Sequence, residues 1–290
     1  MYQNHDSRVR QLNLVLASTC YNPERYHALL KIMRDVYSEK GNLVEILGLY
    51  LPAFSTGHCF VPRPPGRPKG EWTASAFDDR KALLAGCSLR EILRNFGAES
   101  VILWVAMLLK KRVVVYAGGS GDELALVQRA VRALPQLTFH RGPDAWRALR
   151  PLVTCDCPDG IADLETAAQE GGFVAGTCDP DFRSQHAGMI DLYVDLAGKT
   201  LSVSEHARKD FGMGKMHKTI AAKLIEHGEA ETDSAAIKSV TQLNLSIIAK
   251  LKALGQPIAN DSLKEFCDAQ KYTKSESRFM LNFASAERML

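Results

Sequence analysis

The apolar pattern near the start of the chain predicts a short strand followed by a helix. The leucines that alternate with polar residues, at the period of a half-buried strand, are Leu12, Leu14 and Leu16. Asn22 and Pro23 then suit a helix start, because an asparagine side chain caps free amides and a proline pre-sets the first turn. Apolar residues recur at intervals of three and four up to Tyr37, and Gly41 marks the predicted end.

The next segment predicts a second short helix that ends before Pro52, followed by a proline-rich stretch. The sequence from Pro62 to Gly70, PRPPGRPKG, contains four prolines and therefore excludes a helix or a central strand. We interpret it as a loop or linker. A proline-rich ligand for an aromatic groove is the less favoured alternative.

From Phe77 the pattern changes to helices that alternate with buried strands. Ser88 and Glu91 have capping-box spacing, and Gly97 is placed to end the helix that follows. An apolar helix is predicted at 100–111, with a cationic end that suits the negative end of the helix dipole, and a strand at 113–115.

A further helix is predicted from Leu124 until Pro135, and short strands at 137–139 and 173–175. Residues 190–196 alternate apolar with polar positions before the turn Ala197-Gly198-Lys199, so they pair with 201–203 in a hairpin. After Val203 only helical periodicity remains. The fold class is therefore α/β, a central mixed sheet flanked by helices, with an α-helical C-terminal part.

Composition narrows the class of protein. The 290 residues are 46% hydrophobic and 24% charged, which is typical of soluble globular proteins. The longest apolar run, Val101–Leu109, has nine residues, against the ~20 that a membrane span needs. A net charge of +3 does not favour nucleic acid as a partner. Seven scattered cysteines without a secretory leader indicate reduced thiols in the cytoplasm.

Two glycine-containing stretches superficially suggest phosphate binding. The turn Gly118–Gly121 follows a strand and precedes a helix, but Leu124 stands where a dinucleotide fingerprint needs its third glycine. Asp122 and Glu123 would also repel an anion there, so a surface turn is favoured over a nucleotide or S-adenosylmethionine site. The stretch Gly212–Thr219, GMGKMHKT, lacks phosphate-loop spacing and is better explained as a helix with a basic face.

Other candidate chemistry is equally incomplete. Cysteines with C-x-C spacing do not match a structural zinc knuckle, and no zinc-protease or nucleophile-elbow motif occurs. The possible zinc ligands considered are Cys155, Cys157, Cys178 and His140. The neighbouring acid pairs are Asp78 with Asp79 and Asp179 with Asp181, for which helix caps and turns are favoured. Trp104 and Trp146 are expected in the core.

We therefore assign no catalytic, cofactor-binding or metal-binding residue and expect no cofactor. Partner-binding residues remain unassigned. Lys110, Lys111 and Arg112 are exposed candidates, although a role at the helix end is favoured for them.

Several separated segments resemble a known family. They are FDDRKALLAG, FGAESVILWVAMLLKKRVVVY, ALPQLTFHRGPDAW, FVAG and DLYVDLAGKTLSV. Their order, a buried helix running into a strand, an aromatic-and-histidine segment and a strand pair before a helical tail, resembles the central part of a DENN domain. CYNPERYHALLKIMRDVY, MGKMHKTIAAKLI and FASAERML extend the similarity to nearly the whole chain. It most resembles the small late-endosomal kind found in the Commander recycling assembly.

The resemblance implies that the chain consists of four parts. Residues 1–56 would be a remnant of a longin-like module, 57–76 a proline-rich linker, 77–203 the central α/β module and 204–290 the helical module. Because the chain starts at what resembles the last strand and helices of the longin-like module, the resemblance also implies an amino-terminal truncation. Leu12, Leu14 and Leu16 would then form an unprotected edge strand.

The implied function is guanine-nucleotide exchange on a Rab GTPase in late endosomal traffic and recycling. Such a factor binds the nucleotide-free GTPase best and makes no covalent bond, so missing catalytic motifs count little against it. A non-catalytic scaffold that docks on coiled-coil subunits of a Commander-type complex is the close alternative. An α/β enzyme using the Gly118–Gly121 turn is the third. The expected location is cytoplasmic and peripheral on late endosomes, through partners.

Overall fold

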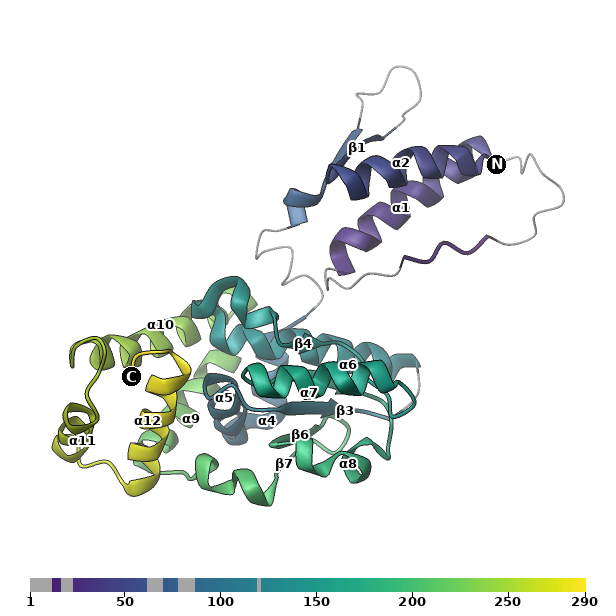
Figure 1. The fold of residues 1–290 in the computed structure, drawn as a ribbon. Helices are drawn as coiled ribbons and strands as arrows, with labels where there is room; N and C mark the ends of the chain where they lie inside the picture. The colour runs from purple at the N-terminus through teal and green to yellow at the C-terminus, as the bar shows by residue number, and fades with distance from the viewer. Residues whose placement is uncertain (1–11, 17–22, 62–69, 78–86, 119–120) are drawn as a thin grey trace. The chain divides into compact units, whose positions relative to one another are not determined.

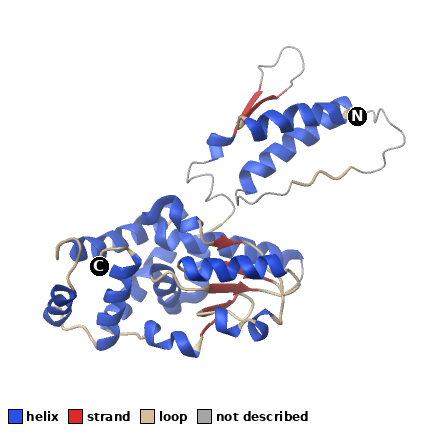
Figure 2. Cartoon of the chain, viewed as in Figure 1, coloured by secondary structure: helices blue, strands red, loops and turns tan. Residues whose placement is uncertain are grey.

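The computed structural model describes residues 12–16, 23–61, 70–77, 87–118 and 121–290. Figures 1 and 2 show its helices and strands. The contacts divide the chain into two compact units, residues 1–85 and 86–290, which are described separately.

The first unit contains two helices and a hairpin. α1 (Pro23–Lys40) and α2 (Leu43–Ser55) are followed by the antiparallel strands β1 (His58–Val61) and β2 (Gly70–Thr73) and a 3-10 turn (Ala74–Phe77). The predicted helix from Pro23 is confirmed, and Gly41 follows it at a φ of 64°. The Asn22 cap lies outside the described residues. The core of the unit consists of Leu29, Met33, Val36, Ile46, Leu49, Ala53, Cys59 and Trp72.

Three expectations for the first unit are wrong. Residues 12–16 form no strand; Leu14 and Leu16 instead pack against the core of the helices, which produces the same alternation without a ladder. α2 continues through Pro52 to Ser55, although an interior proline loses its own N–H bond and its ring crowds the carbonyl four residues earlier, here that of the exposed Gly48. The segment interpreted as a linker contributes both hairpin strands, while the proline-rich residues 62–69 lie outside the described residues.

The second unit is built on a five-stranded mixed sheet. Its strands are β3 (Val113–Tyr116), β4 (Leu149–Arg150), β5 (Val174–Thr177), β6 (Leu192–Asp195) and β7 (Thr200–Val203). Their order is β4-β5-β3-β6-β7, and every pair is parallel except the hairpin β6–β7. The valines of the central strand β3 are fully buried, as expected of a strand covered on both faces. The predicted mixed sheet and its hairpin are confirmed.

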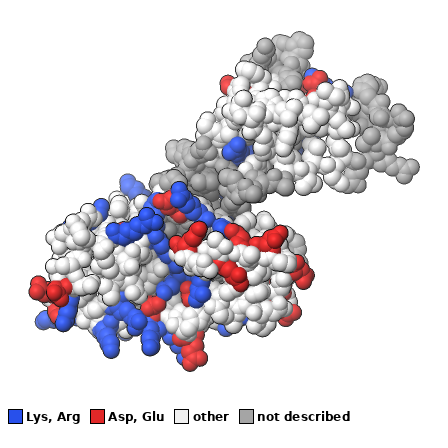
Figure 3. Space-filling model, in the orientation of Figure 1, with Lys and Arg blue, Asp and Glu red and all other residues white. Residues whose placement is uncertain are grey.

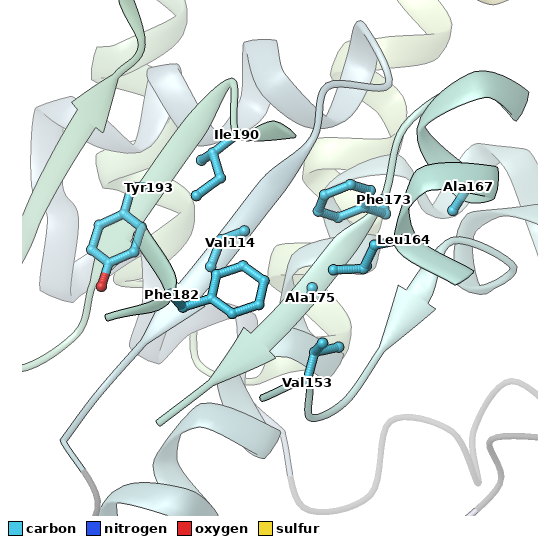
Figure 4. Close-up of a cluster of buried hydrophobic side chains, with 9 residues drawn as sticks. All are labelled: Val114, Val153, Leu164, Ala167, Phe173, Ala175, Phe182, Ile190 and Tyr193. Carbon is cyan, nitrogen blue, oxygen red and sulfur yellow. The ribbon is translucent and has the colours of Figure 1, made fainter. Parts of the chain in front are cut away.

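Helices cover both faces of this sheet. On one face, Leu164 and Ala167 of α7 (Pro158–Glu170) and Phe182 of α8 (Phe182–Gln185) pack against residues of β3, β5 and β6, as Figure 4 shows. On the other face, α6 (Gly121–Ala133) approaches β5 so closely that only glycine fits at position 176. A Cβ atom there would lie 2.6 Å from Val127 Cγ1 and 2.5 Å from the Pro151 carbonyl oxygen.

The apolar helix α5 (Ser100–Leu108) has eight buried residues among its nine. It packs against α4 (Leu89–Phe96), which Ser88 caps as predicted, and against the helical tail. The tail consists of a 3-10 segment (Glu205–Phe211), α9 (Lys215–Gly228), α10 (Asp233–Lys252), α11 (Asn260–Ala269) and α12 (Lys274–Ala286). Trp104 is fully buried, its indole Nε1 donates to Asn244 Oδ1 of α10 at 2.8 Å, and its ring stacks on Phe279 of α12.

The predicted strand at 137–139 is wrong, because residues 134–146 form a 3-10 segment with a turn at Gly142. The Leu137 carbonyl accepts a hydrogen bond from Asn244 Nδ2 at 2.7 Å rather than from a neighbouring strand. From the same segment, Arg141 donates to the carbonyls of Met107 and Leu108 at the end of α5 and to the Glu287 carboxylate just after α12. The Arg141 side chain therefore connects the end of α5 to the C-terminal residues that follow α12.

We expect Gly176→Ala to destabilise the second unit by about 1–3 kcal/mol, because the added methyl group meets α6 and a backbone carbonyl rather than empty space. Thermal unfolding followed by circular dichroism measures the effect. Gly188→Ala is the matched control, since a Cβ there has no neighbour within 4 Å. Equal unfolding midpoints for the two variants would contradict the close approach of α6.

Candidate functional surfaces

The glycine-rich turn after β3 has the strand–turn–helix arrangement that a nucleotide site needs, but not its electrostatics. α6 begins at Gly121, while residues 119–120 lie outside the described residues. The Glu123 carboxylate lies against Gly118, where a Cβ atom would be 2.8 Å from its Oε1. A negative carboxylate therefore occupies the space beside the turn, so the enzyme alternative gains no support at this position.

The stretch Gly212–Thr219 contains the start of α9, and two of its backbone N–H groups already bond to side chains. The Oε1 atom of Glu276 accepts from the Met216 N–H at 2.6 Å, and a Cβ atom at Gly214 would be 2.4 Å from the Glu276 carboxyl carbon. The other oxygen accepts from the Thr273 N–H at 2.7 Å. One buried carboxylate thus caps both α9 and α12, and the helix predicted for this stretch is confirmed. The lysines of α9, Lys215, Lys218 and Lys223, are exposed.

The possible metal ligands do not come together. Within the described residues, no group of three or more His, Cys, Asp or Glu side chains could hold a metal ion. His140 faces Asn244 and Glu287 instead. Burial, together with Asp179, raises the pKa of Cys155 to about 11, so its thiol stays protonated and is a poor ligand or nucleophile.

The acid pairs behave as turn residues where they are described. Asp179 accepts from the backbone N–H groups of Cys155 and Asp181 at 3.1 and 3.0 Å, which fixes the loop before α8. Asp78 and Asp79 lie outside the described residues.

Trp146 is half-buried, with its ring 5.8 Å from that of Phe139.

Two of the three cationic candidates after α5 form internal ion pairs. Lys111 Nζ lies 2.5 Å from Asp210 Oδ2, and Arg112 forms two hydrogen bonds to the Asp191 carboxylate. Burial alone would raise the pKa of Asp191, but the guanidinium of Arg112 holds it below its ordinary value. The carbonyls at the end of α5 are bound by Arg141, which the sequence analysis missed because it lies 34 residues from Met107. Lys110 remains exposed.

A groove of about 620 Å³ runs beside β6 and β7. Its wall includes Arg183, whose guanidinium carbon lies 4.9 Å from the centre of the Tyr193 ring, and that ring stacks on Tyr116. Ser202, Ser204 and His206 also line the groove. Aromatic, cationic and hydroxyl groups in one hollow are typical of protein-binding surfaces.

β7, which contributes Ser202 to this groove, is an edge strand of the sheet. Since the Ser204 N–H bonds to the Asp191 carbonyl, the antiparallel register turns the N–H and C=O groups of Leu201 and Val203 away from β6. Among the described residues, nothing bonds to these outward groups. An extended segment of a partner can pair with them.

A second exposed surface lies on α2 in the first unit. Figure 3 shows few charged side chains on the described part of this unit. The exposed apolar residues of α2 are Leu43, Val44, Leu47, Tyr50, Leu51 and Phe54. Four of them, at intervals of four, three and four, form the seam that one helix presents to another in a coiled coil. We call this set the α2 apolar face.

A second cleft, of about 640 Å³, is lined largely by charged side chains and lies at the amino ends of β3 and β5, away from Gly118. Of the helices in the described residues, none combines the length and apolar character needed to cross a membrane.

Comparisons with known proteins identify relatives along nearly the whole chain. A family model described as "Stabilization of polarity axis" (SPA) matches residues 87–205. The chain is 32% identical to DENN domain-containing protein 10 of Dictyostelium discoideum, over 97% of this chain and 74% of that protein. The proteins of the same name from Danio rerio and Homo sapiens are 30% and 28% identical, over 98% of this chain and 77% and 76% of their own lengths.

We expect Glu276→Gln to destabilise the helical tail by about 1–3 kcal/mol at neutral pH, because the neutral amide replaces charge-assisted bonds to two helix starts. Burial alone would raise the pKa of Glu276, but the hydrogen bonds from Thr273 and Met216 lower it. A lowered folded pKa means that the stabilisation is present above the unfolded pKa and disappears as the pH falls through the folded value. Urea unfolding at neutral pH and below about pH 4 measures this.

The matched control for this prediction is Glu265→Gln, on the exposed side of α11. It should leave stability within about 0.5 kcal/mol of the parent at both pH values. A destabilisation by Glu276→Gln that does not shrink in acid would contradict the role of the charge.

Proposed function

The chain belongs to the DENN-domain family, and on this premise we propose that it acts as a guanine-nucleotide exchange factor for a Rab GTPase in late endosomal traffic and recycling. The observation that carries the proposal is the similarity to DENN domain-containing protein 10 over 97% of the chain, which includes both units. We also infer that the first unit corresponds to the longin-like module and the second to the rest of a DENN-type fold. The protein would be cytoplasmic and would reach late endosomes through its partners.

The chemistry of exchange agrees with the surfaces described above. An exchange factor accelerates nucleotide release by binding the nucleotide-free GTPase more tightly than the loaded one, so it needs a complementary surface rather than reacting groups. The groove beside β7 supports this proposal because Arg183 and Tyr193 line it and the adjoining edge of β7 has outward backbone groups. We place the GTPase contact there.

Nucleotide release tests this directly. The purified chain is mixed with a panel of Rab GTPases loaded with fluorescent GDP, and we expect at least one to release nucleotide faster. Arg183→Glu should reduce that acceleration at least about tenfold, since it reverses a charge in the groove, while Lys250→Glu on the exposed side of α10 should not. No acceleration for any Rab, with a full-length relative active in the same assay, would overturn the proposal.

The α2 apolar face favours a second candidate function, a non-catalytic scaffold subunit of a Commander-type recycling complex. A seam of apolar residues at heptad intervals suits a helical partner such as a coiled-coil subunit. Such a role needs no exchange activity.

Co-purification separates the two candidates. We expect Leu47→Asp to abolish capture of coiled-coil partners without lowering the unfolding midpoint, because the Leu47 side chain is 55% exposed and contributes little to the core. Leu245→Asp, at a 48% exposed leucine of α10, is the matched control. Retained capture by Leu47→Asp, or equal loss in the control, would contradict docking on the α2 apolar face.

A further inference from the structure

The cleft at the amino ends of β3 and β5 is enclosed by the ends of three helices. α5, α7 and α12 all finish beside it, at Leu108, Glu170 and Ala286. Gly172 allows the close approach of two of them, since a Cβ atom there would lie 2.0 Å from the Lys110 carbonyl oxygen. This glycine has a φ of 89°, which other residues rarely adopt. The shape of the cleft is therefore fixed by the backbone.

Positive charge predominates in its lining. The cationic residues are Lys110, Lys111, Arg141, Arg147, Arg150 and Arg288, and the acidic ones are Asp144, Glu170 and Glu287. Four of these cations are paired: Arg141 with Glu287 and Arg147 with Asp144 inside the cleft, and Lys111 and Arg150 with Asp210 and Asp163 just outside it. The carboxyl ends of the three helices each carry about half a negative charge, and Arg141 binds the carbonyls of one of them, the end of α5. In Figure 3, Lys and Arg side chains gather over the middle of the larger unit and acidic ones over its right side.

The least exposed acid of the cleft, Glu287, already has two partners. Arg141 donates to Glu287 Oε1 at 2.8 Å through Nε, and His140 Nε2 lies 3.5 Å from the same oxygen. Burial alone would raise the pKa of Glu287, but these partners lower it to about 2. Glu287 is therefore ionised and held by Arg141, which in turn is fixed against the α5 carbonyls. Its charge is not available to neutralise the other cations.

Lys110 and Arg288 are the two cations of the cleft lining for which the described residues provide no partner. Both are exposed, and among the described residues neither side chain has a hydrogen bond or ion pair. Both also follow a helix end with positive φ, 52° and 56°, where glycine is the favoured residue. The pKa of Lys110 is lowered by desolvation and by the charge of Arg141, with Arg288 adding to the effect. An anion between these groups would relieve that repulsion.

We propose that this cleft binds a small ligand with several phosphate groups, which Lys110 and Arg288 contact directly and Arg141 faces from the wall. Its volume of about 640 Å³ is within the usual range for small-ligand sites. The separate positions of the cations, on two helix ends and one 3-10 segment, suit several phosphates better than a single one. The same chemistry is offered by a soluble inositol phosphate and by a phosphoinositide headgroup.

The backbone at these positions allows a test that separates binding from folding. In the double variant Lys110→Gly/Arg288→Gly, glycine removes both charges while suiting the positive φ values, so the unfolding midpoint should be unchanged or higher. Lys271→Gly is the control, because Lys271 is an exposed lysine with a φ of 54° at the end of α11, outside the cleft. The probes are inositol hexakisphosphate, by titration calorimetry, and phosphatidylcholine vesicles with and without a phosphatidylinositol phosphate, by co-sedimentation.

We expect the full chain to bind inositol hexakisphosphate, the phosphoinositide vesicles or both, and the double variant to bind at least about tenfold more weakly while Lys271→Gly binds like the parent. Binding to the soluble probe alone assigns the site to a free phosphate compound, and binding to vesicles alone assigns it to a headgroup. Failure of the parent to bind either probe overturns the proposal. So does undiminished binding by the double variant, or an equal loss in Lys271→Gly, which would show attraction by overall charge.

Discussion

A helix that is apolar on every side has to be enclosed by the rest of the chain, and α5 imposes this constraint on the second unit. With eight of its nine residues buried, it cannot lie on a surface as an amphipathic helix does. The chain meets the requirement with α4 and the helical tail. Enclosure also buries polar groups of α5, and long-range side chains bind them: Asn244 binds the Trp104 indole, and Arg141 binds the last carbonyls. The position of the tail follows from these demands.

Local signals made much of the second unit predictable. Ser88 caps its own helix within four residues, and the β6–β7 hairpin depends on a turn and a period of two. The first unit was less predictable because Leu14 and Leu16 alternate as in a strand, and only their neighbours in space decide whether a ladder exists. Short apolar segments such as 137–139 are ambiguous for the same reason.

The residues whose partners lie far away in the sequence were the hardest to predict. Glu276 has capping-box spacing with Thr273, but no motif marks its bond to a helix start 60 residues away or the pairing of Arg141 with an acid 146 residues away. The cationic stretch 110–112 shows the opposite difficulty. Its three residues look alike in sequence, yet two are engaged by Asp210 and Asp191 and only Lys110 is left without such a partner among the described residues. Whether a charged side chain is paired inside the protein or exposed for binding depends on residues far away in the sequence. A short stretch of sequence therefore does not show it.

The distance along the chain between α5 and its cover has a consequence for biosynthesis. Asn244 follows Trp104 by 140 residues, so at 5–20 residues per second a ribosome completes α5 on the order of ten seconds before its partner on α10 is made. During that interval the nascent chain carries an apolar helix whose final neighbours do not yet exist. Early folding of this unit therefore depends on temporary shielding of α5, by the newly made sheet or by a chaperone at the ribosome exit.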